Sequence, residues 1–351
     1  MGRQRVLDCV RGFPVDHPVA APYMGNYAIG CSGRHPATCQ KDALLMAKAQ
    51  LETWKRLHQE VIVVQSDNYY MAEAFGAPVI HQENRMPVLA GSAIVCEEDI
   101  WRLEPVDPRK SGRMPVYIEA IGRISHSVGQ QAAVRGCGTG PFVLAGHVLG
   151  IERLLLWMAE TDGGIQDHGE ALHYLFSVGL ETLVAFATAQ LESGATIVQL
   201  ADSLASLQVI SPQMYRTYVF PYEREFFSRI HPVCQKHDAV ALLHICGNNT
   251  AVFEDYVDSG ADIIAVDHAA SLAEAARIVG NRCCIIGNIN PCGVLLWGKP
   301  EEVASQAHEC LEAVLPNRYL LGTGCEVAMD TPFDNIKALL AVTENPTGGT
   351  V

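Results

Sequence analysis

Short apolar runs alternate with longer stretches of helical spacing along this chain, and the alternation limits the possible folds more than any other feature. The runs have the length and composition of buried strands, and candidate helices lie between the later ones. Strand alternating with helix eight times predicts an α/β fold, a (β/α)8 TIM-type barrel. The expected strands cover residues 17–25, 61–67, 132–138, 195–202, 240–247, 262–268, 283–289 and 318–325.

The second half of the chain is more regular than the first. We expect a single barrel domain over residues 1–351, with insertions in its N-terminal half. The proline-rich stretch 76–113 has weak periodicity and is predicted to be an insertion, and 147–193 is predicted to be a pair of long helices. The other expected helices cover 212–237, 271–280, 300–315 and 332–343.

Composition narrows the class of protein. Hydrophobic residues make up 49% and charged residues 18%, with no evident apolar run of about 18 residues that could span a bilayer and no signal peptide, so a cytoplasmic protein is expected. The net charge of −14 and the lack of a basic cluster argue against nucleic-acid binding. In a reducing compartment the 12 cysteines are expected to be mostly buried, inert thiols.

Polar residues lie at the ends of several expected strands. In (β/α)8 barrels the chemistry is found at the carboxyl ends of the strands. An aspartate there can simply cap the next helix, but a whole set of polar strand ends predicts a site at the barrel mouth. The set is Asp67, Asp202, His244 with Cys246, Asp267, Asn288 and Cys325.

Three of these residues suit a metal. His244 and Cys246, in "LLHICGNNT", are two positions apart and therefore point to the same face of a strand. Cys325, in "GTGCEVAMDTP", ends another strand and supplies a third ligand. Three protein ligands and one open position are typical of catalytic zinc, whereas structural zinc usually has four. A histidine beside an inert thiol in the core is the alternative for the first pair alone.

Four segments carry a resemblance to a known family: "VQLADSLASLQVISPQMYRTYVFPYEREF", "LLHICGNNT", "IIGNINPCGVLLWGKPEEV" and "YLLGTGCEVAMDTPFDNIKAL". They resemble the uroporphyrinogen decarboxylase superfamily, most of all its zinc-dependent methyltransferases that work with corrinoid proteins. The resemblance is dense from about residue 130 to 345. It implies a (β/α)8 barrel and a zinc ion held by His244, Cys246 and Cys325. It also implies methyl transfer to or from the cobalt of a corrinoid (cobalamin), which a separate partner protein must carry because this chain has no "DxHxxG" segment.

The decarboxylase branch of the superfamily is the alternative lyase function. Its members share two closely spaced early arginines that hold porphyrin carboxylates, whereas "APYMGNYAIGCSGRHPA" has only Arg34. Asp67, in "VVQSDNYY", does fall near the decarboxylase aspartate, so this alternative stays open.

The direction of methyl transfer depends on the substrate pocket. Tyrosines in the early loops, Tyr27 and Tyr69 among them, and the scarcity of positive charge favour a methoxy-aromatic substrate and O-demethylation. A small thiol such as coenzyme M is the alternative, with Arg34 as a partner for its sulfonate. Asp202, Asn288, Asp67 and Asp267 are candidates for holding substrate or metal ligands, although helix capping and loop hydrogen bonding would also explain them. The sequence leaves open whether the enzyme forms a homo-oligomer.

Overall fold

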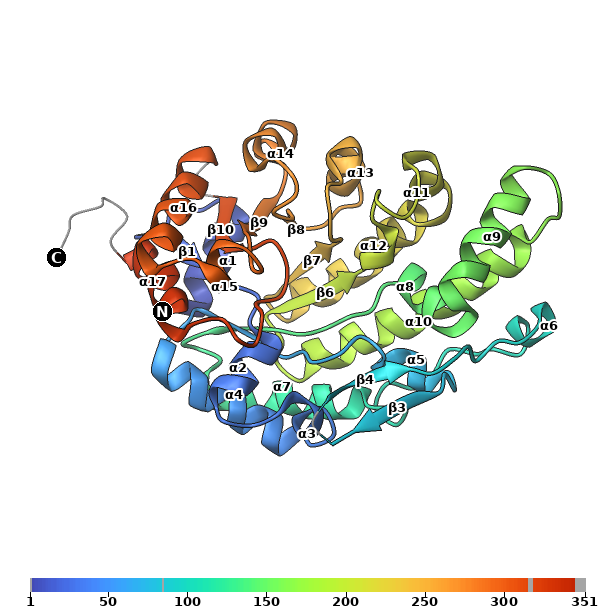
Figure 1. The fold of residues 1–351 in the computed structure, drawn as a ribbon, viewed down its shortest axis with the longest axis horizontal. Helices are drawn as coiled ribbons and strands as arrows, with labels where there is room; N and C mark the ends of the chain where they lie inside the picture. Colours follow the sequence, from blue (N-terminus) through green and yellow to red (C-terminus); the bar gives the residue numbers. More distant parts are fainter. Residues whose placement is uncertain (1, 84, 315–317, 345–351) are drawn as a thin grey trace.

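A computed structural model describes residues 2–83, 85–314 and 318–344 of the chain. Its main sheet has eight parallel strands in the order β1-β10-β9-β8-β7-β6-β5-β2 (Figure 1). Every strand lies inside one of the eight expected runs, so the predicted (β/α)8 barrel is confirmed. The strands are β1 (Val19–Ala20), β2 (Val61–Val63), β5 (Ala133–Arg135), β6 (Ile197–Ala201), β7 (Val240–His244), β8 (Ile263–Ala265), β9 (Cys284–Ile289) and β10 (Tyr319–Thr323).

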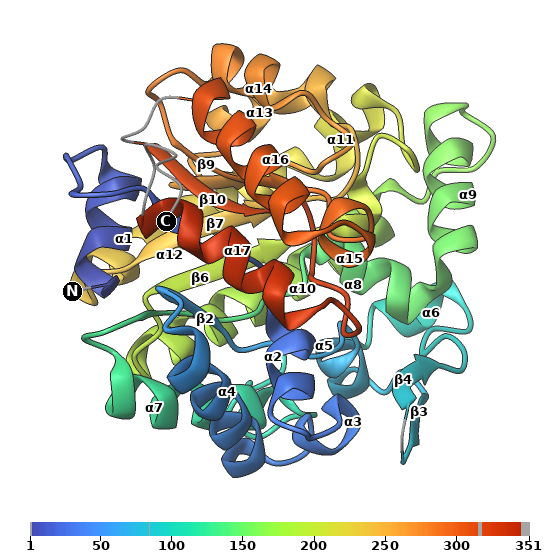
Figure 2. The same cartoon turned by 60° about the vertical axis from the view of Figure 1, so that its left-hand side comes forward.

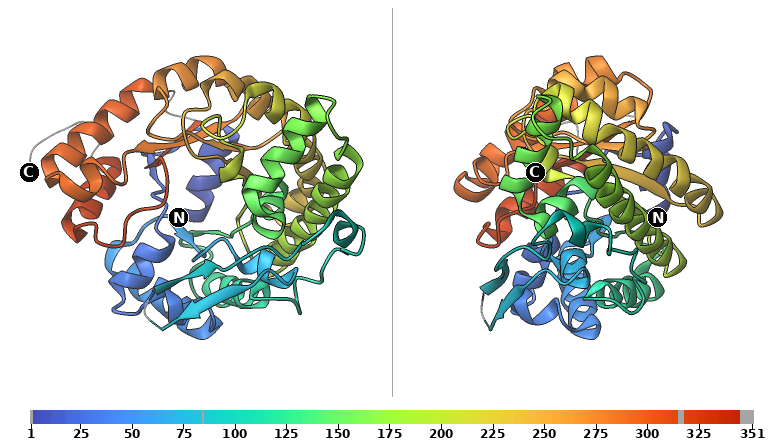
Figure 3. Two further views of the ribbon diagram at one scale, coloured as in Figure 1. Left: turned by 45° about the vertical axis from the view of Figure 1, so that its right-hand side comes forward. Right: turned by 90° about the vertical axis from the view of Figure 1, so that its right-hand side faces the viewer.

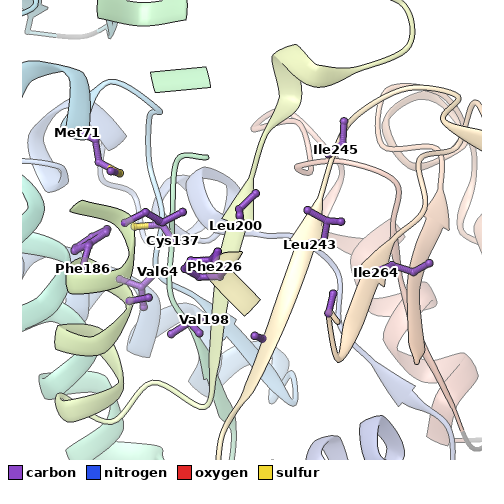
Figure 4. Close-up of a cluster of buried hydrophobic side chains, with 14 of the residues drawn as sticks. Val64, Met71, Cys137, Phe186, Val198, Leu200, Phe226, Leu243, Ile245 and Ile264 are labelled. Carbon is purple, nitrogen blue, oxygen red and sulfur yellow. The ribbon is translucent and has the colours of Figure 1, made fainter. Parts of the chain in front are cut away.

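The two faces of each strand serve two separate cores. On β7, Val240 and Leu242 belong to the barrel interior, whereas Leu243 and Ile245 pack against the surrounding helices. Figure 4 shows part of this outer core. Because side chains alternate along a strand, this register directs His244 into the barrel.

Helix α1 (Gly2–Arg11) closes the amino-terminal end of the barrel. Its buried residues Val6, Leu7, Cys9 and Val10 join the interior cluster of apolar strand residues. The opposite end, where the strands finish, is therefore the end that remains available for a site.

A ring of helices covers the outside of the strands (Figures 2 and 3). Each helix of this ring contacts the strand that follows it in the chain, except the last, which contacts β1. They are α4 (Ala43–Leu57) on β2, α7 (Met114–Val128) on β5, α10 (Gly169–Glu192) on β6, α12 (Phe220–Lys236) on β7, α14 (Leu272–Val279) on β9, α16 (Pro300–Ala313) on β10 and α17 (Phe333–Glu344) on β1.

Other helices lie in the loops between these elements. They are α2 (Gly25–Cys31), α3 (Pro36–Cys39), α5 (Tyr70–Ala74), α6 (Glu97–Ile100), α8 (Pro141–Ala145), α9 (Ile151–Asp162), α11 (Pro212–Tyr218), α13 (Phe253–Asp258) and α15 (Val294–Trp297), with single turns η1 (Gly146–Gly150), η2 (Ser203–Ala205) and η3 (Thr250–Val252).

One helix that was expected to be continuous is divided in two. The stretch 212–237 forms two helices, α11 and α12, that meet at Val219. Pro221 explains the break, because proline has no amide hydrogen to donate and its ring clashes with the preceding turn. The expected helix 300–315 ends at Ala313 as α16, and its last residue lies outside the described residues.

The stretch 76–113 forms structure outside the barrel. It contains an antiparallel hairpin of β3 (Val79–Gln82) and β4 (Arg85–Leu89), followed by α6. In Figure 1 this hairpin, α6 and α9 lie on the side away from the chain termini. That 76–113 is an insertion in a single-domain barrel stays a prediction.

Two helical stretches are long and apolar enough to cross a membrane, so the expectation that no such run exists is wrong on length and composition. They are residues Pro141–Asp162 and Gly169–Glu192. Half of the most apolar window of the first and 61% of that of the second are buried inside the fold, and core helices pass the same test.

Candidate metal centre

His244, Cys246 and Cys325 come together at the carboxyl ends of β7 and β10. One potential ligand atom of each lies within 4.8 Å of the others. Cys246 Sγ is 3.3 Å from His244 Nε2 and 3.6 Å from Cys325 Sγ. Two sulfurs bound tetrahedrally at about 2.3 Å from zinc would be about 3.8 Å apart, so the observed separations fit a zinc ion.

The local backbone explains how the two cysteines meet. Gly247 follows Cys246 with φ +91°, a conformation that favours glycine, and a Cβ there would lie 2.5 Å from Ser206 Oγ. Gly324 precedes Cys325, and a Cβ there would lie 2.3 Å from the backbone nitrogen of His268. Each glycine therefore lets its loop pass close to another loop at the same end of the barrel.

The two thiols share hydrogen bonding. The interaction with Cys246, together with His244, lowers the pKa of Cys325, and the same pairing raises the pKa of Cys246. One thiolate is thus favoured even before a metal binds, which suits ligands that must lose their protons to coordinate.

Asp202 and Asn288 are engaged in structural hydrogen bonds. Asp202 is fully buried, and its carboxylate accepts from the backbone nitrogens of Val143 (2.7 Å) and Phe142 (3.4 Å), so it caps α8. Burial raises its pKa to about 7. The Asn288 amide donates to the carbonyls of Asp267 and Ala270, at 3.3 and 3.0 Å, and holds the loop after β8.

Asp67 forms a buried ion pair. Both its oxygens accept from Arg113, one at 2.8 Å, and Arg113 also bonds Glu73 and Gln40. The side chains of Arg113 and Asp67 are 8% and 4% exposed. Asp67 is therefore committed to the protein rather than free to bind a substrate.

The two predicted tyrosines have different surroundings. Tyr27 is buried in the outer core. Tyr69 packs its ring 4.9 Å from that of His147, and both line a cavity of about 450 Å³ with Leu89, Ser92, Ile151 and Leu204. Leu204 follows Asp202, whose backbone nitrogen donates to the His244 carbonyl (3.0 Å), so this cavity lies beside the end of β6.

Two acidic residues lie close to the cysteines. Asp267 accepts from the backbone of Ala269 and lies 3.0 Å from His268 Nδ1, and its charge acts on Cys246. Glu326, next to Cys325, accepts from the backbone nitrogen of Asn26 at 2.7 Å, and burial raises its pKa to about 7.

A polar layer inside the barrel was missed at the sequence level. Arg135 on β5 is 2% exposed, and its Nε and Nη2 both donate to Gln199 Oε1 on β6. Gln199 in turn donates to Gln65 Oε1, and the Arg135 guanidinium lies over the Tyr23 ring. The signal was present, because an arginine within the apolar run "AAVRGCG" is as unusual as a histidine in "LLHICG".

Barrel, capped bottom and ligand cluster together define a (β/α)8 enzyme with one nitrogen and two sulfur donors at the mouth. The chain belongs to the uroporphyrinogen decarboxylase (URO-D) family, whose sequence model matches residues 1–345.

Three similar proteins are methyltransferases. Methylcobamide:CoM methyltransferase MtaA of Methanosarcina barkeri is 27% identical over 300 residues, which cover 85% of this chain and 83% of that protein. The methylated-thiol–coenzyme M methyltransferase of Methanosarcina mazei is 28% identical and covers 98% of this chain and 89% of its own. The solved structure of a methyltransferase from Methanosarcina mazei superimposes with a TM-score of 0.86 at 25% identity, covering 98% of both chains. The expected class, an enzyme of the methyltransferase type within this family, is thereby confirmed.

Proposed function

We propose that the protein is a zinc-dependent methyltransferase that moves a methyl group between a small thiol and the cobalt of a corrinoid carried by a separate protein. The observation that carries the proposal is the convergence of His244, Cys246 and Cys325, from two different strands, on one point at the barrel mouth. The two relatives named for coenzyme M support a thiol as the substrate.

The three side chains would hold zinc and leave its fourth position to the substrate sulfur. Bound zinc would act as a Lewis acid that lowers the pKa of the thiol. The chain itself orients the ligands: His244 is the last residue of β7, Cys246 follows two residues later with its Sγ 3.3 Å from His244 Nε2, and Thr323 Oγ1 donates to the Cys325 carbonyl at 2.6 Å. The capped lower end of the barrel leaves the mouth as the side from which the corrinoid protein would reach the methyl group.

A methoxy-aromatic substrate, favoured by the sequence, is the second candidate. The observation in its favour is the cavity lined by Tyr69 and His147, whose mostly apolar walls would suit an aromatic ring. Arg34, considered as a sulfonate partner, instead pairs with Glu52. The lyase alternative is disfavoured, because the aspartate it would require is Asp67, which Arg113 already neutralises.

Metal content tests the proposal first. We expect about one zinc per chain in the wild type by plasma mass spectrometry and a clear loss in Cys325→Ser. Cys292→Ser, which changes an exposed cysteine outside the cluster, is the matched control and should retain zinc. Undiminished zinc in Cys325→Ser would contradict the assignment of the three ligands.

Methyl-transfer assays then separate the substrates. Methylcobalamin with small thiols should give S-methyl products, and cob(I)alamin with methoxy-aromatics should give phenols only if the second candidate is right. The cytoplasmic location and any self-association stay predictions of the sequence.

A further inference from the structure

Arg135 is a buried cation whose hydrogen-bond partners are neutral. Within the part of the chain that the structure describes, no carboxylate lies within the 4.0 Å of an ion pair with it, and its bonds go to the amide oxygen of Gln199. The other buried arginine, Arg113, has two carboxylate partners. A guanidinium does not lose its proton in proteins, so Arg135 places a positive charge inside the barrel that no carboxylate pairs with directly.

Tyr23 connects this charge to the metal centre. The guanidinium carbon of Arg135 lies 4.3 Å from the centroid of the Tyr23 ring, and that ring meets the His244 ring edge-on at 5.8 Å between centroids. These two distances limit the separation between the Arg135 charge and the His244 ring to about 10 Å. The ionisable groups whose charges act on Arg135 are Tyr23, Cys325 and Glu326, and Glu326 is bonded to Asn26 rather than to Arg135.

The net charge of the zinc-loaded site would depend on whether the substrate binds as an anion or as a neutral molecule. Zinc held by two cysteine thiolates and a neutral imidazole would carry no net charge, so a substrate thiolate in the fourth position would add one negative charge to a centre that already lies beside Asp267 and Glu326. The proton of the thiol goes to the solvent in this step. Arg135 supplies one positive charge from below.

We propose that Arg135 is the counter-cation for a substrate bound as an anion at the metal centre, and so a positioning residue that selects thiols over neutral thioethers. The inference rests on the proposed function and deepens it. Arg135 bonds Gln199 and packs on Tyr23, so it would act on the substrate through its electric field rather than by contact.

Binding of 2-mercaptoethanol to the zinc-loaded protein, followed by isothermal titration calorimetry in two buffers, tests the inference. We expect binding with release of about one proton in the wild type. In Arg135→Met the affinity should fall about tenfold, the order of magnitude for one charge roughly 10 Å from the substrate sulfur at an effective dielectric constant of about 20. Arg135→Lys should retain most of the affinity. The thioether 2-(methylthio)ethanol, which has no proton to lose, should be unaffected by either change.

Gln199→Glu distinguishes an electrostatic effect of Arg135 on binding from an effect on the stability of the fold. It gives Arg135 a carboxylate partner, so thiol affinity should fall as in Arg135→Met while the melting temperature stays at or above that of the wild type. Equal thiol affinities in the wild type, Arg135→Met and Gln199→Glu would overturn the role of Arg135 and leave the proposed function standing. If the zinc-loaded wild type binds no thiol, the proposed function falls, and the inference falls with it.

Discussion

Breaking the ion pair between Asp67 and Arg113 should destabilise the fold strongly, and substitution of Arg113 should cost more than substitution of Asp67. Arg113→Met leaves the buried Asp67 carboxylate with the backbone nitrogen of Tyr69 as its remaining partner, and removing one member of a buried pair costs about 3–5 kcal/mol. Asp67→Asn leaves Arg113 paired with Glu73 and bonded to Gln40, so we expect a smaller loss of about 2 kcal/mol. The double variant should lose less than the sum of the two.

Urea denaturation followed by far-ultraviolet circular dichroism measures these free energies. Arg123→Met is the matched control, because Arg123 lies on α7, the helix that Arg113 directly precedes, and its pair with Glu119 is exposed, which limits its contribution to about 1 kcal/mol or less. If Arg113→Met is no less stable than Arg123→Met, the reasoning about burial is wrong. Loss of zinc in a folded Asp67→Asn protein would refute the structural role assigned to this aspartate.

Three further predictions concern other parts of the mouth. Burial lowers the pKa of His147 from 6.5 to about 4. The unfolded chain therefore binds a proton more readily than the folded one, so up to about 3 kcal/mol of stability that is present above pH 6.5 is lost as the pH falls towards 4. Denaturation series between pH 4 and 7 should show a flatter stability profile for His147→Phe. Gly247→Ala should cost about 1–3 kcal/mol because of its positive φ and the contact with Ser206, and should lower zinc content by displacing the preceding cysteine. Trp297, 81% exposed after β9, should help to hold the corrinoid protein: Trp297→Ala should slow methyl transfer from that protein and not from free methylcobalamin, whereas Phe13→Ala, after the helix at the opposite end, should slow neither.

The barrel could be predicted because its signals are local. Each strand is a short apolar run, and the two-residue spacing of His244 and Cys246 predicted that they share a face. The strand itself ends at His244, but Cys246 still lies beside it. Placing Cys325 beside them needed only the rule that parallel strands of a barrel end on one side.

The polar residues around the centre were harder, because their roles depend on partners far away in the sequence. Asp202 looked like a substrate ligand, and only its contact with Val143 shows that it caps a helix. Asp67 finds Arg113 at the end of a stretch that the sequence marks as an insertion. Arg135 is visible in the sequence as a charged residue within an apolar run, but only the folded barrel shows that it has no carboxylate partner.

The order of the strands along the chain also has a consequence for how the protein matures. β10 joins the barrel between β9 and β1, so it completes a sheet whose other seven strands have already been synthesised. Cys325 follows β10, whereas His244 ends the much earlier β7 and Cys246 comes just after it. During synthesis the histidine and the first cysteine are therefore made three strands before Cys325. Until then they could offer a metal only two ligands, and metal bound by two ligands would exchange readily. If the protein binds zinc as proposed, secure loading of the metal would be a late step in biogenesis, coupled to closure of the sheet rather than to the folding of the segment that carries the first two ligands.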